Sequence, residues 1–436
     1  MFFLERQALI DQAYNSIDVT TQTAKFLIEA FYGKRPDYSY HVGCSTGGRQ
    51  GMVFSQNFPD YYDGIVAGAP VYMRQAISLT EVWGVQAIKA IPGPIETTRD
   101  GSPTFRLKFP VEDQQLFTRA ILEACDGLDG AVDGVIDDLR TCQATFDPAT
   151  YVFRDTGQHT GQPLRCTGAK TPACLSPAQI GAVKKINEGP RNSAGETIQA
   201  PVGGSVHPHP DNTVVGYPYD GGFMAPSGIP SRKIGTLTSP PRDLALGVSR
   251  IGYEWLDPPD PSFDGLSFDW DTDVDRLVTE SPFSSSVSLN IEKFRNRGGK
   301  IIWYHGISDP GPPSTLTTDY YNALAKKSGG VRWAQRFSRL YLIPNMGHCG
   351  GGPATVQFDM LTPLVNWVEN GVAPHEIIAS GTNFTSDQKE RSRPLCAYPE
   401  EARYDGPAGG DLSVADNYRC IMPPNAEDAI KHAIIR

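Results

Sequence analysis

The chain of 436 residues is 39% hydrophobic and 20% charged, so it can bury a sizeable core and wholesale disorder is not expected. Its formal net charge of −10, without any Lys/Arg block, argues against a nucleic-acid-binding protein. No apolar run approaches the ~18 residues of a membrane helix. The length suits two or three domains, or one large α/β domain with an insertion.

Helices and strands alternate in the two outer parts of the chain. We expect a helix at the start, a helix over residues 18–31, a strand over 38–44, a helix over 48–57 and a buried strand over 64–70. Later come a strand over 300–306, a helix over 317–327, a strand over 340–344, a helix over 356–370 and a last strand over 376–379. This alternation predicts an α/β fold with a doubly wound parallel sheet.

The middle of the chain, residues 72–293, lacks this rhythm. It is rich in Gly, Pro, Asp and aromatic residues and contains four of the eight cysteines. We therefore interpret residues 72–293 as a lid domain inserted between two strands of the sheet. Residues 1–71 and 294–436 together would form the catalytic domain.

The eight cysteines indicate structural disulfides. Six of them form close pairs in loop-rich sequence: Cys125 with Cys142, Cys166 with Cys174, and Cys396 with Cys420. Such pairing is typical of an oxidising compartment, so we expect a secreted or periplasmic protein; reduced, partly buried thiols are the alternative. The chain opens without an apolar leader, as expected of a mature, processed or truncated form. Asn383-Phe384-Thr385 fits a glycosylation acceptor.

A candidate nucleophile follows the first predicted strand. Gly43-Cys44-Ser45-Thr46-Gly47 fits the pattern G-x-S-x-G, which places a serine on a tight turn between a strand and a helix. The backbone N–H of Thr46 would then donate to an oxyanion, and the start of the helix adds favourable potential. A plain glycine-rich turn is the alternative.

A serine nucleophile needs a histidine base and an acid that orients it. His348 follows a predicted strand in a glycine-rich loop, and Asp309 follows the strand over residues 300–306. The order Ser, Asp, His is that of α/β hydrolases. His305 competes as the base, but it precedes the acid at a strand end, and we interpret it as structural.

Two further cysteines flank these candidates. Cys44 directly precedes Ser45, and Cys349 directly follows His348. A disulfide holds its two Cα atoms about 5.5–6 Å apart, so a bond between these cysteines would make the nucleophile and the base neighbours. Two unrelated buried thiols are the alternative.

Residues 125–142 contain several aspartates at short spacing, separated by glycines. Carboxylate oxygens and backbone carbonyls in a curling loop suit Ca²⁺, although the spacing is not that of an EF-hand. Closely packed acids would repel one another without a cation. A solvated acidic turn is the alternative.

Taken together, Cys44-Ser45, Asp309, His348-Cys349 and the C-terminal run from Arg393 to Pro399 resemble the tannase and feruloyl esterase family. The resemblance extends from about residue 1 to residue 422. It implies a disulfide between the two catalytic segments and a structural calcium site in the lid. The implied calcium ligands are the side chains of Asp126, Asp129 and Asp133 and the carbonyls of Ala131 and Val135. Members of the family cleave esters of aromatic acids, mono(2-hydroxyethyl) terephthalate among them.

The sequence departs from this family in one respect, because only 44 residues precede the nucleophile where members have roughly a hundred. We expect that the opening strands and the loop with the second oxyanion donor are missing, and that an N-terminal segment or another chain completes the fold. The resulting hypothesis is a serine esterase for small aromatic esters, acting through Ser45, His348 and Asp309. A lipase-like or peptidase-like hydrolase and an inactive fragment or calcium-stabilised binding protein are the alternatives.

Overall fold

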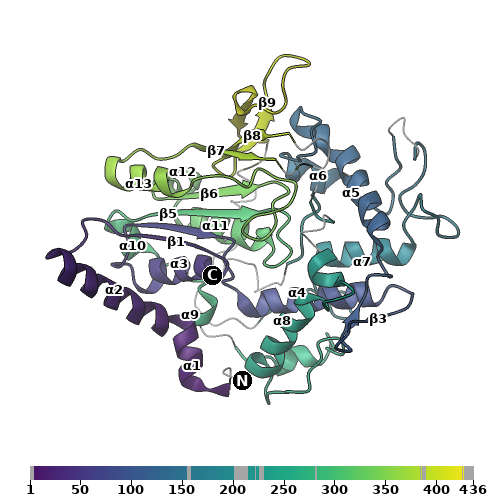
Figure 1. Ribbon diagram of the computed structural model, residues 1–436, viewed down its shortest axis with the longest axis horizontal. Coiled ribbons are helices and arrows are strands. Elements are labelled where there is room, and N and C mark those ends of the chain that lie inside the picture. Colours follow the sequence, from purple (N-terminus) through teal and green to yellow (C-terminus); the bar gives the residue numbers. More distant parts are fainter. Residues whose placement is uncertain are drawn as a thin grey trace.

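The computed structural model describes residues 4–154, 159–200, 215–220, 222–224, 230–279, 282–382, 384, 389–424 and 426. Asn383 and Thr385 of the predicted glycosylation acceptor lie outside these residues. In Figure 1 the sheet and the helices that pack on it occupy the left and centre of the view, and most of the middle part of the chain lies to their right. No helix among the described residues is long and apolar enough to cross a membrane.

The central sheet has the strand order β1-β2-β5-β6 among the described residues. Its strands are β1 (Tyr40–Cys44), β2 (Gly64–Gly68), β5 (Lys300–Gly306) and β6 (Ser338–Ile343). All three pairings are parallel, with Cys44 beside Gly68 and Gly68 beside Tyr304. The carboxyl ends of the strands therefore lie along one edge, where the ligands of such sheets bind.

Side chains alternate between the two faces of this sheet, as strand geometry requires. Ile65, Ile301 and Trp303 pack with helix residues of α3 (Thr46–Asn57) and α11 (Ser314–Lys327). Val66, Ile302 and Tyr341 pack instead with α13 (Leu361–Asn370). Helices thus cover both faces, which is the doubly wound arrangement expected from the sequence.

The chain reaches the sheet through α1 (Arg6–Ile10), η2 (Asp11–Asn15) and α2 (Ser16–Tyr32). β1 follows at one edge of the described sheet. The expectation that opening strands lie outside this chain stays a prediction.

A long insertion separates β2 from β5, although these strands are neighbours in the sheet. Its elements are α4 (Arg74–Lys89), β3 (Glu96–Thr97), β4 (Pro103–Thr104), α5 (Val111–Cys125), η3 (Asp126–Asp129), α6 (Leu139–Thr145), α7 (Pro177–Glu188), η5 (Pro230–Ile234), α8 (Arg242–Arg250), η6 (Ile251–Trp255), η7 (Asp273–Arg276), α9 (Pro282–Ser285) and α10 (Glu292–Asn296). One hydrophobic cluster, from Val85 to Leu244, consists of insertion residues alone. We refer to residues 72–293, the bounds expected from the sequence, as the insertion, although α10 continues to Asn296 before β5 begins. Its role as a lid stays a prediction.

Two expectations for the C-terminal part need correction. The predicted helix over residues 356–370 begins only at Leu361, after α12 (Val331–Ala334) and β6. Gln357 exchanges backbone hydrogen bonds with Ser380, which holds this stretch extended, and the Asp359 side chain accepts from the Leu361 N–H at the helix start. The last predicted strand is present but lies outside the parallel sheet.

The C-terminal strands form two antiparallel pairs. These are β7 (Glu376–Gly381) with β8 (Arg391–Cys396), and β9 (Glu401–Tyr404) with β10 (Tyr418–Ile421), the latter following η8 (Ala415–Asn417). The chain segment that follows β8, rather than β7, lies next to β6, and the Tyr398 N–H donates to the Leu340 carbonyl there. β7 is therefore displaced from the sheet edge that the sequence pattern suggests for it.

All four expected disulfides are present: Cys44–Cys349, Cys125–Cys142, Cys166–Cys174 and Cys396–Cys420. None of the eight cysteines is free. The first bond joins β1 to the loop after β6, across 305 positions, while the other three are local. The alternative of reduced thiols is therefore wrong.

Candidate active site

Ser45 sits on a sharp turn between β1 and α3. Its backbone has φ +64° and ψ −119°, which is an unusual conformation for a residue other than glycine. A Cβ on Gly43 would lie 2.6 Å from the Gly47 backbone, and a Cβ on Gly48 would lie 2.2 Å from the Gly68 carbonyl oxygen. The small residues around the serine are thus required by the close packing of the turn.

The three residues predicted as a triad lie together at the carboxyl ends of β1, β5 and β6. His348 Nε2 is 2.8 Å from Ser45 Oγ, and His348 Nδ1 is 2.7 Å from Asp309 Oδ2. The Asp309 side chain is fully buried, whereas that of His348 is 24% exposed. Three parallel strands that end at the same edge explain how residues 303 positions apart meet.

A second histidine contacts the acid. His305 Nε2 lies 3.2 Å from Asp309 Oδ2, and its Nδ1 lies 2.8 Å from Thr317 Oγ1. Burial alone would raise the pKa of Asp309, but hydrogen bonds from His305 and His348 lower that pKa to about 2. Asp309 therefore stays ionised over the range in which proteins work. Sequence reasoning treated His305 as structural and missed this contact, because a spacing of four residues beyond a strand end says little about distance.

The disulfide between Cys44 and Cys349 fixes the two flanking segments directly. Its Cα atoms are 6.0 Å apart. Because each cysteine is adjacent in sequence to a member of the Ser45–His348 pair, the covalent bond limits how far these two side chains can separate. The predicted disulfide between Cys44 and Cys349 is therefore confirmed, and it makes the segments of Ser45 and His348 neighbours.

Thr46 begins α3 directly after Ser45. The first N–H groups of a helix have no acceptor inside that helix and are available to a negative oxygen. The Thr46 N–H is thus placed beside Ser45 at a helix N-terminus, as the oxyanion prediction requires.

The acidic loop, residues 126–138, folds around its own aspartates. Asp126 accepts from the N–H groups of Asp133 and Gly134, and Asp129 accepts from those of Ala131 and Asp137. Burial raises the pKa of both Asp126 and Asp129 to about 6. Two desolvated carboxylates on one loop are the chemistry that a hard cation stabilises.

One expected ligand has another partner. Asp133 forms an ion pair with Arg393, and the Tyr418 hydroxyl donates to it. In the part of the chain that the structure describes, the loop's carboxylates do not form a group of three with ligand oxygens within 4.8 Å of one another. Of the three expected carboxylate ligands, Asp126 and Asp129 are therefore the two left without a cationic side-chain partner of this kind among the described residues, and Asp133 would join them only by leaving Arg393.

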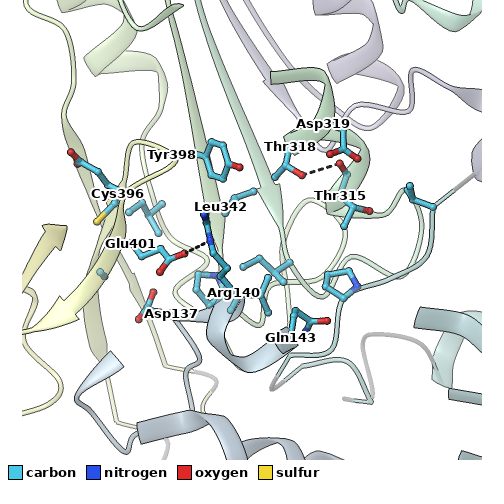
Figure 2. A pocket seen from close by; sticks show the side chains of 18 of the residues that line it. Asp137, Arg140, Gln143, Thr315, Thr318, Asp319, Leu342, Cys396, Tyr398 and Glu401 are labelled. Atoms are coloured by element: carbon cyan, nitrogen blue, oxygen red, sulfur yellow. Dashed lines mark hydrogen bonds and ion pairs between the residues drawn. The ribbon is translucent and has the colours of Figure 1, made fainter. Parts of the chain in front are cut away.

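A cavity of about 510 Å³ lies between the insertion and the C-terminal part of the chain. Figure 2 shows Arg140 and Glu401 pointing toward each other in its lining, together with Leu342 and Tyr398. The two charged groups lie 3.9 Å apart. Burial raises the pKa of Glu401 to about 7. Ser45 and His348 are not among its described lining residues, so this cavity is separate from the serine and its base.

The model of the tannase and feruloyl esterase family matches residues 1–421. The chain belongs to this family. It is 39% identical to a mono(2-hydroxyethyl) terephthalate hydrolase of Piscinibacter sakaiensis over 97% of this chain and 70% of that protein. It is 31% identical to a probable feruloyl esterase of Arthroderma benhamiae over 94% of this chain and 68% of that protein.

The fold is shared with solved structures of esterases. An esterase from Aspergillus oryzae superposes with a TM-score of 0.71 at 25% identity, covering 96% of this chain and 76% of that one. The fold is therefore of the α/β-hydrolase type, and the protein is a carboxylic ester hydrolase.

Proposed function

We propose that this protein hydrolyses esters of small aromatic acids through a Ser45-His348-Asp309 triad. The observation that carries the proposal is the unbroken chain of contacts from Ser45 Oγ through His348 to the buried carboxylate of Asp309. The names of the relatives support the substrate class, since they include a hydrolase of mono(2-hydroxyethyl) terephthalate and a probable feruloyl esterase.

In the proposed mechanism, Ser45 Oγ attacks the ester carbonyl carbon while His348 Nε2 takes the hydroxyl proton. The oxyanion of the tetrahedral intermediate accepts a hydrogen bond from the Thr46 N–H. His348 then gives the proton to the leaving alcohol as the acyl-enzyme forms. A water molecule, deprotonated by His348, hydrolyses the acyl-enzyme and releases the aromatic acid, and the proton returns to Ser45.

In this mechanism Asp309 orients and stabilises His348, the proposed base. Its carboxylate holds His348 in the tautomer that presents an unprotonated Nε2 to Ser45 and stabilises the imidazolium that forms. The contact with His305 helps to keep Asp309 ionised, because hydrogen bonds from His305 and His348 together lower the pKa of that carboxyl to about 2.

A structural Ca²⁺ in the acidic loop is part of the proposal. Asp126, Asp129 and the carbonyls of Ala131 and Val135 would hold it, and Asp133 would join them on leaving Arg393. When bound, the ion would neutralise carboxylates that burial otherwise keeps in an unfavourable charged state. The loop belongs to the insertion, which we propose covers the active site as a lid. The four disulfides favour a secreted or periplasmic enzyme.

Turnover of methyl ferulate and methyl gallate, together with labelling by a serine-reactive aryl phosphonate, tests the proposal. The wild-type protein should hydrolyse at least one of these esters and carry the label on Ser45. Ser45→Ala should lower kcat by about 10⁶-fold while the melting temperature stays near that of the wild type. Turnover that persists in Ser45→Ala, or a wild-type protein that neither hydrolyses an ester nor takes the label, contradicts it.

A further inference from the structure

One buried carboxylate of the insertion, that of Asp220, contacts both the loop that carries Asp309 and the loop that carries His348. Asp220 is 0% exposed. The Ser308 hydroxyl oxygen lies 2.6 and 2.5 Å from its two carboxylate oxygens, and the Asn345 backbone N–H donates to Oδ2 at 3.2 Å. Ser308 directly precedes Asp309, and Asn345 stands three positions before His348. We call residues 308–312, which contain Asp309, the acid loop, and residues 345–349, which contain His348, the base loop. The acidic loop remains the separate stretch of residues 126–138.

The close approach of the insertion at this point depends on glycine. A Cβ on Gly222 would lie 2.2 Å from Ser308 Oγ and 2.9 Å from the Asn345 carbonyl oxygen. Both distances are too short for any side chain, so the backbone of the insertion is seated directly on the acid and base loops. This packing leaves Asp220 little freedom to turn away from them.

Asn345 is held in an unusual conformation by the same region. It is fully buried and has φ +59°. Its side-chain amide donates to the carbonyl of Gly134 in the acidic loop at 2.6 Å and to that of Pro353 at 3.2 Å. Asn345, the first residue of the base loop, is thus held by Asp220 through its backbone N–H and by the acidic loop, residues 126–138, through its side chain.

The insertion also donates hydrogen bonds to backbone carbonyls of the acid loop. Lys233 Nζ donates to the Pro310 carbonyl at 3.1 Å, and the Tyr217 hydroxyl donates to the Gly311 carbonyl at 2.6 Å. Both contacts reach the acid loop alone. Asp220 differs because one side chain accepts from both loops.

Burying a carboxylate costs free energy unless its oxygens accept hydrogen bonds. Burial raises the pKa of Asp220 to about 6, and the groups that offset this are a hydroxyl and backbone amides. What a carboxylate offers over a hydroxyl is two oxygens with several acceptor positions, enough to connect separate loops. The geometry therefore suits the fixing of a distance between loops better than the stabilisation of the insertion alone.

We propose that Asp220 is a positioning residue for the reaction: it holds the acid loop and the base loop at the separation at which His348 reaches both Asp309 and Ser45. This inference rests on the proposed triad. Asp220 contacts neither of the hydrogen-bonded atoms of His348, so its effect is on geometry. A displacement of about 1 Å in such a site can cost about 100-fold in rate.

The test compares Asp220→Ala, Asp220→Asn and the control Asp113→Ala in the full chain. Asp113 is also a buried carboxylate of the insertion, but its partners, Gln179 and Lys170, belong to the insertion too. Asp220→Ala should lower kcat for the aryl ester about 100-fold, with KM changed less than about threefold. Asp220→Asn keeps one acceptor oxygen and should recover kcat to within about tenfold of the wild type. Asp113→Ala should lower the melting temperature with kcat within about threefold of the wild type.

Two results overturn the inference: a kcat for Asp220→Ala within about threefold of the wild type, or a loss in Asp113→Ala as large as that in Asp220→Ala. If Asp220→Ala does not fold, Ser308→Ala removes the same contact from the other side, and an unchanged kcat there overturns it as well. These outcomes leave the proposed function intact when the wild type turns over and Ser45 is labelled. A wild type without turnover or label removes both.

Discussion

The triad and the acidic loop are built in opposite ways. The triad joins three side chains from the ends of three strands, and its parts are far apart in sequence. The acidic loop takes its carboxylates from a single stretch between Cys125 and Cys142, closed by a disulfide of sequence separation 17. In the triad each polar group has a side-chain partner. In the loop, Asp126 and Asp129 are bonded to backbone N–H groups.

This difference determines what each site needs in order to form. The triad forms when the sheet, the disulfide at Cys44 and the contacts of Asp220 bring its three segments together, because its members lie after three separate strands. The acidic loop has its carboxylates on one stretch of the chain, yet two of them are desolvated, and burial raises the pKa of Asp126 and Asp129 to about 6. We therefore expect the triad to respond to changes of its partners and the loop to respond to a cation.

Among these predictions, we expect the largest fall in kcat from Asp309→Asn, which changes the acid of the proposed triad. The amide keeps the shape of the side chain but favours the wrong tautomer of His348, so kcat should fall by about 10⁴-fold. The fold should persist, and circular dichroism with a melting curve checks this. The matched control is His305→Gln, which alters the second contact of Asp309 and should cost less than about tenfold in kcat. An equal loss in both variants would mean that the orientation of Asp309, rather than of His348, limits the rate.

The second prediction separates the long-range disulfide from the local ones. Cys44→Ser together with Cys349→Ser opens a loop of sequence separation 305, whereas Cys166→Ser with Cys174→Ser opens one of 8. Chain entropy predicts that the first pair lowers the free energy of unfolding by about 3 kcal/mol more than the second. Denaturant titration measures this, and ester turnover should fall only in the first variant. Equal losses of stability would show that unfolded-state entropy is not the main contribution.

The third prediction concerns the acidic loop. If it binds Ca²⁺, a free concentration a hundredfold above Kd stabilises the folded state by about 2.7 kcal/mol, so a chelator should lower the melting temperature and added Ca²⁺ should restore it. Asp126→Ala with Asp129→Ala should abolish this response, whereas Asp147→Ala, an acid of the insertion outside the loop, should leave it unchanged. An identical melting curve with and without chelator, with no calcium found in the purified protein, would reduce the loop to an acidic turn.

Local patterns were good guides wherever the physical cause was local. The run into Ser45 predicts a strand, a tight turn and a helix, and the structure has β1, Ser45 with positive φ and α3 in that order. The three close cysteine pairs are bonded as expected. The helix over residues 356–370 begins late because a distant residue, Ser380, holds Gln357 in an extended pairing that periodicity within the helix cannot reveal.

The sequence by itself determined the chemical parts of this protein: a serine in a turn that only small neighbours permit, a base and an acid in the α/β-hydrolase order, and paired cysteines. These depend on steric limits and spacing within a few residues. Only the tertiary structure decided which groups surround those parts. Arg393 on Asp133 and Asp220 between the acid and base loops each join segments from separate parts of the fold. Such contacts depend on how the insertion and the sheet pack together, and no spacing along the chain records that distance.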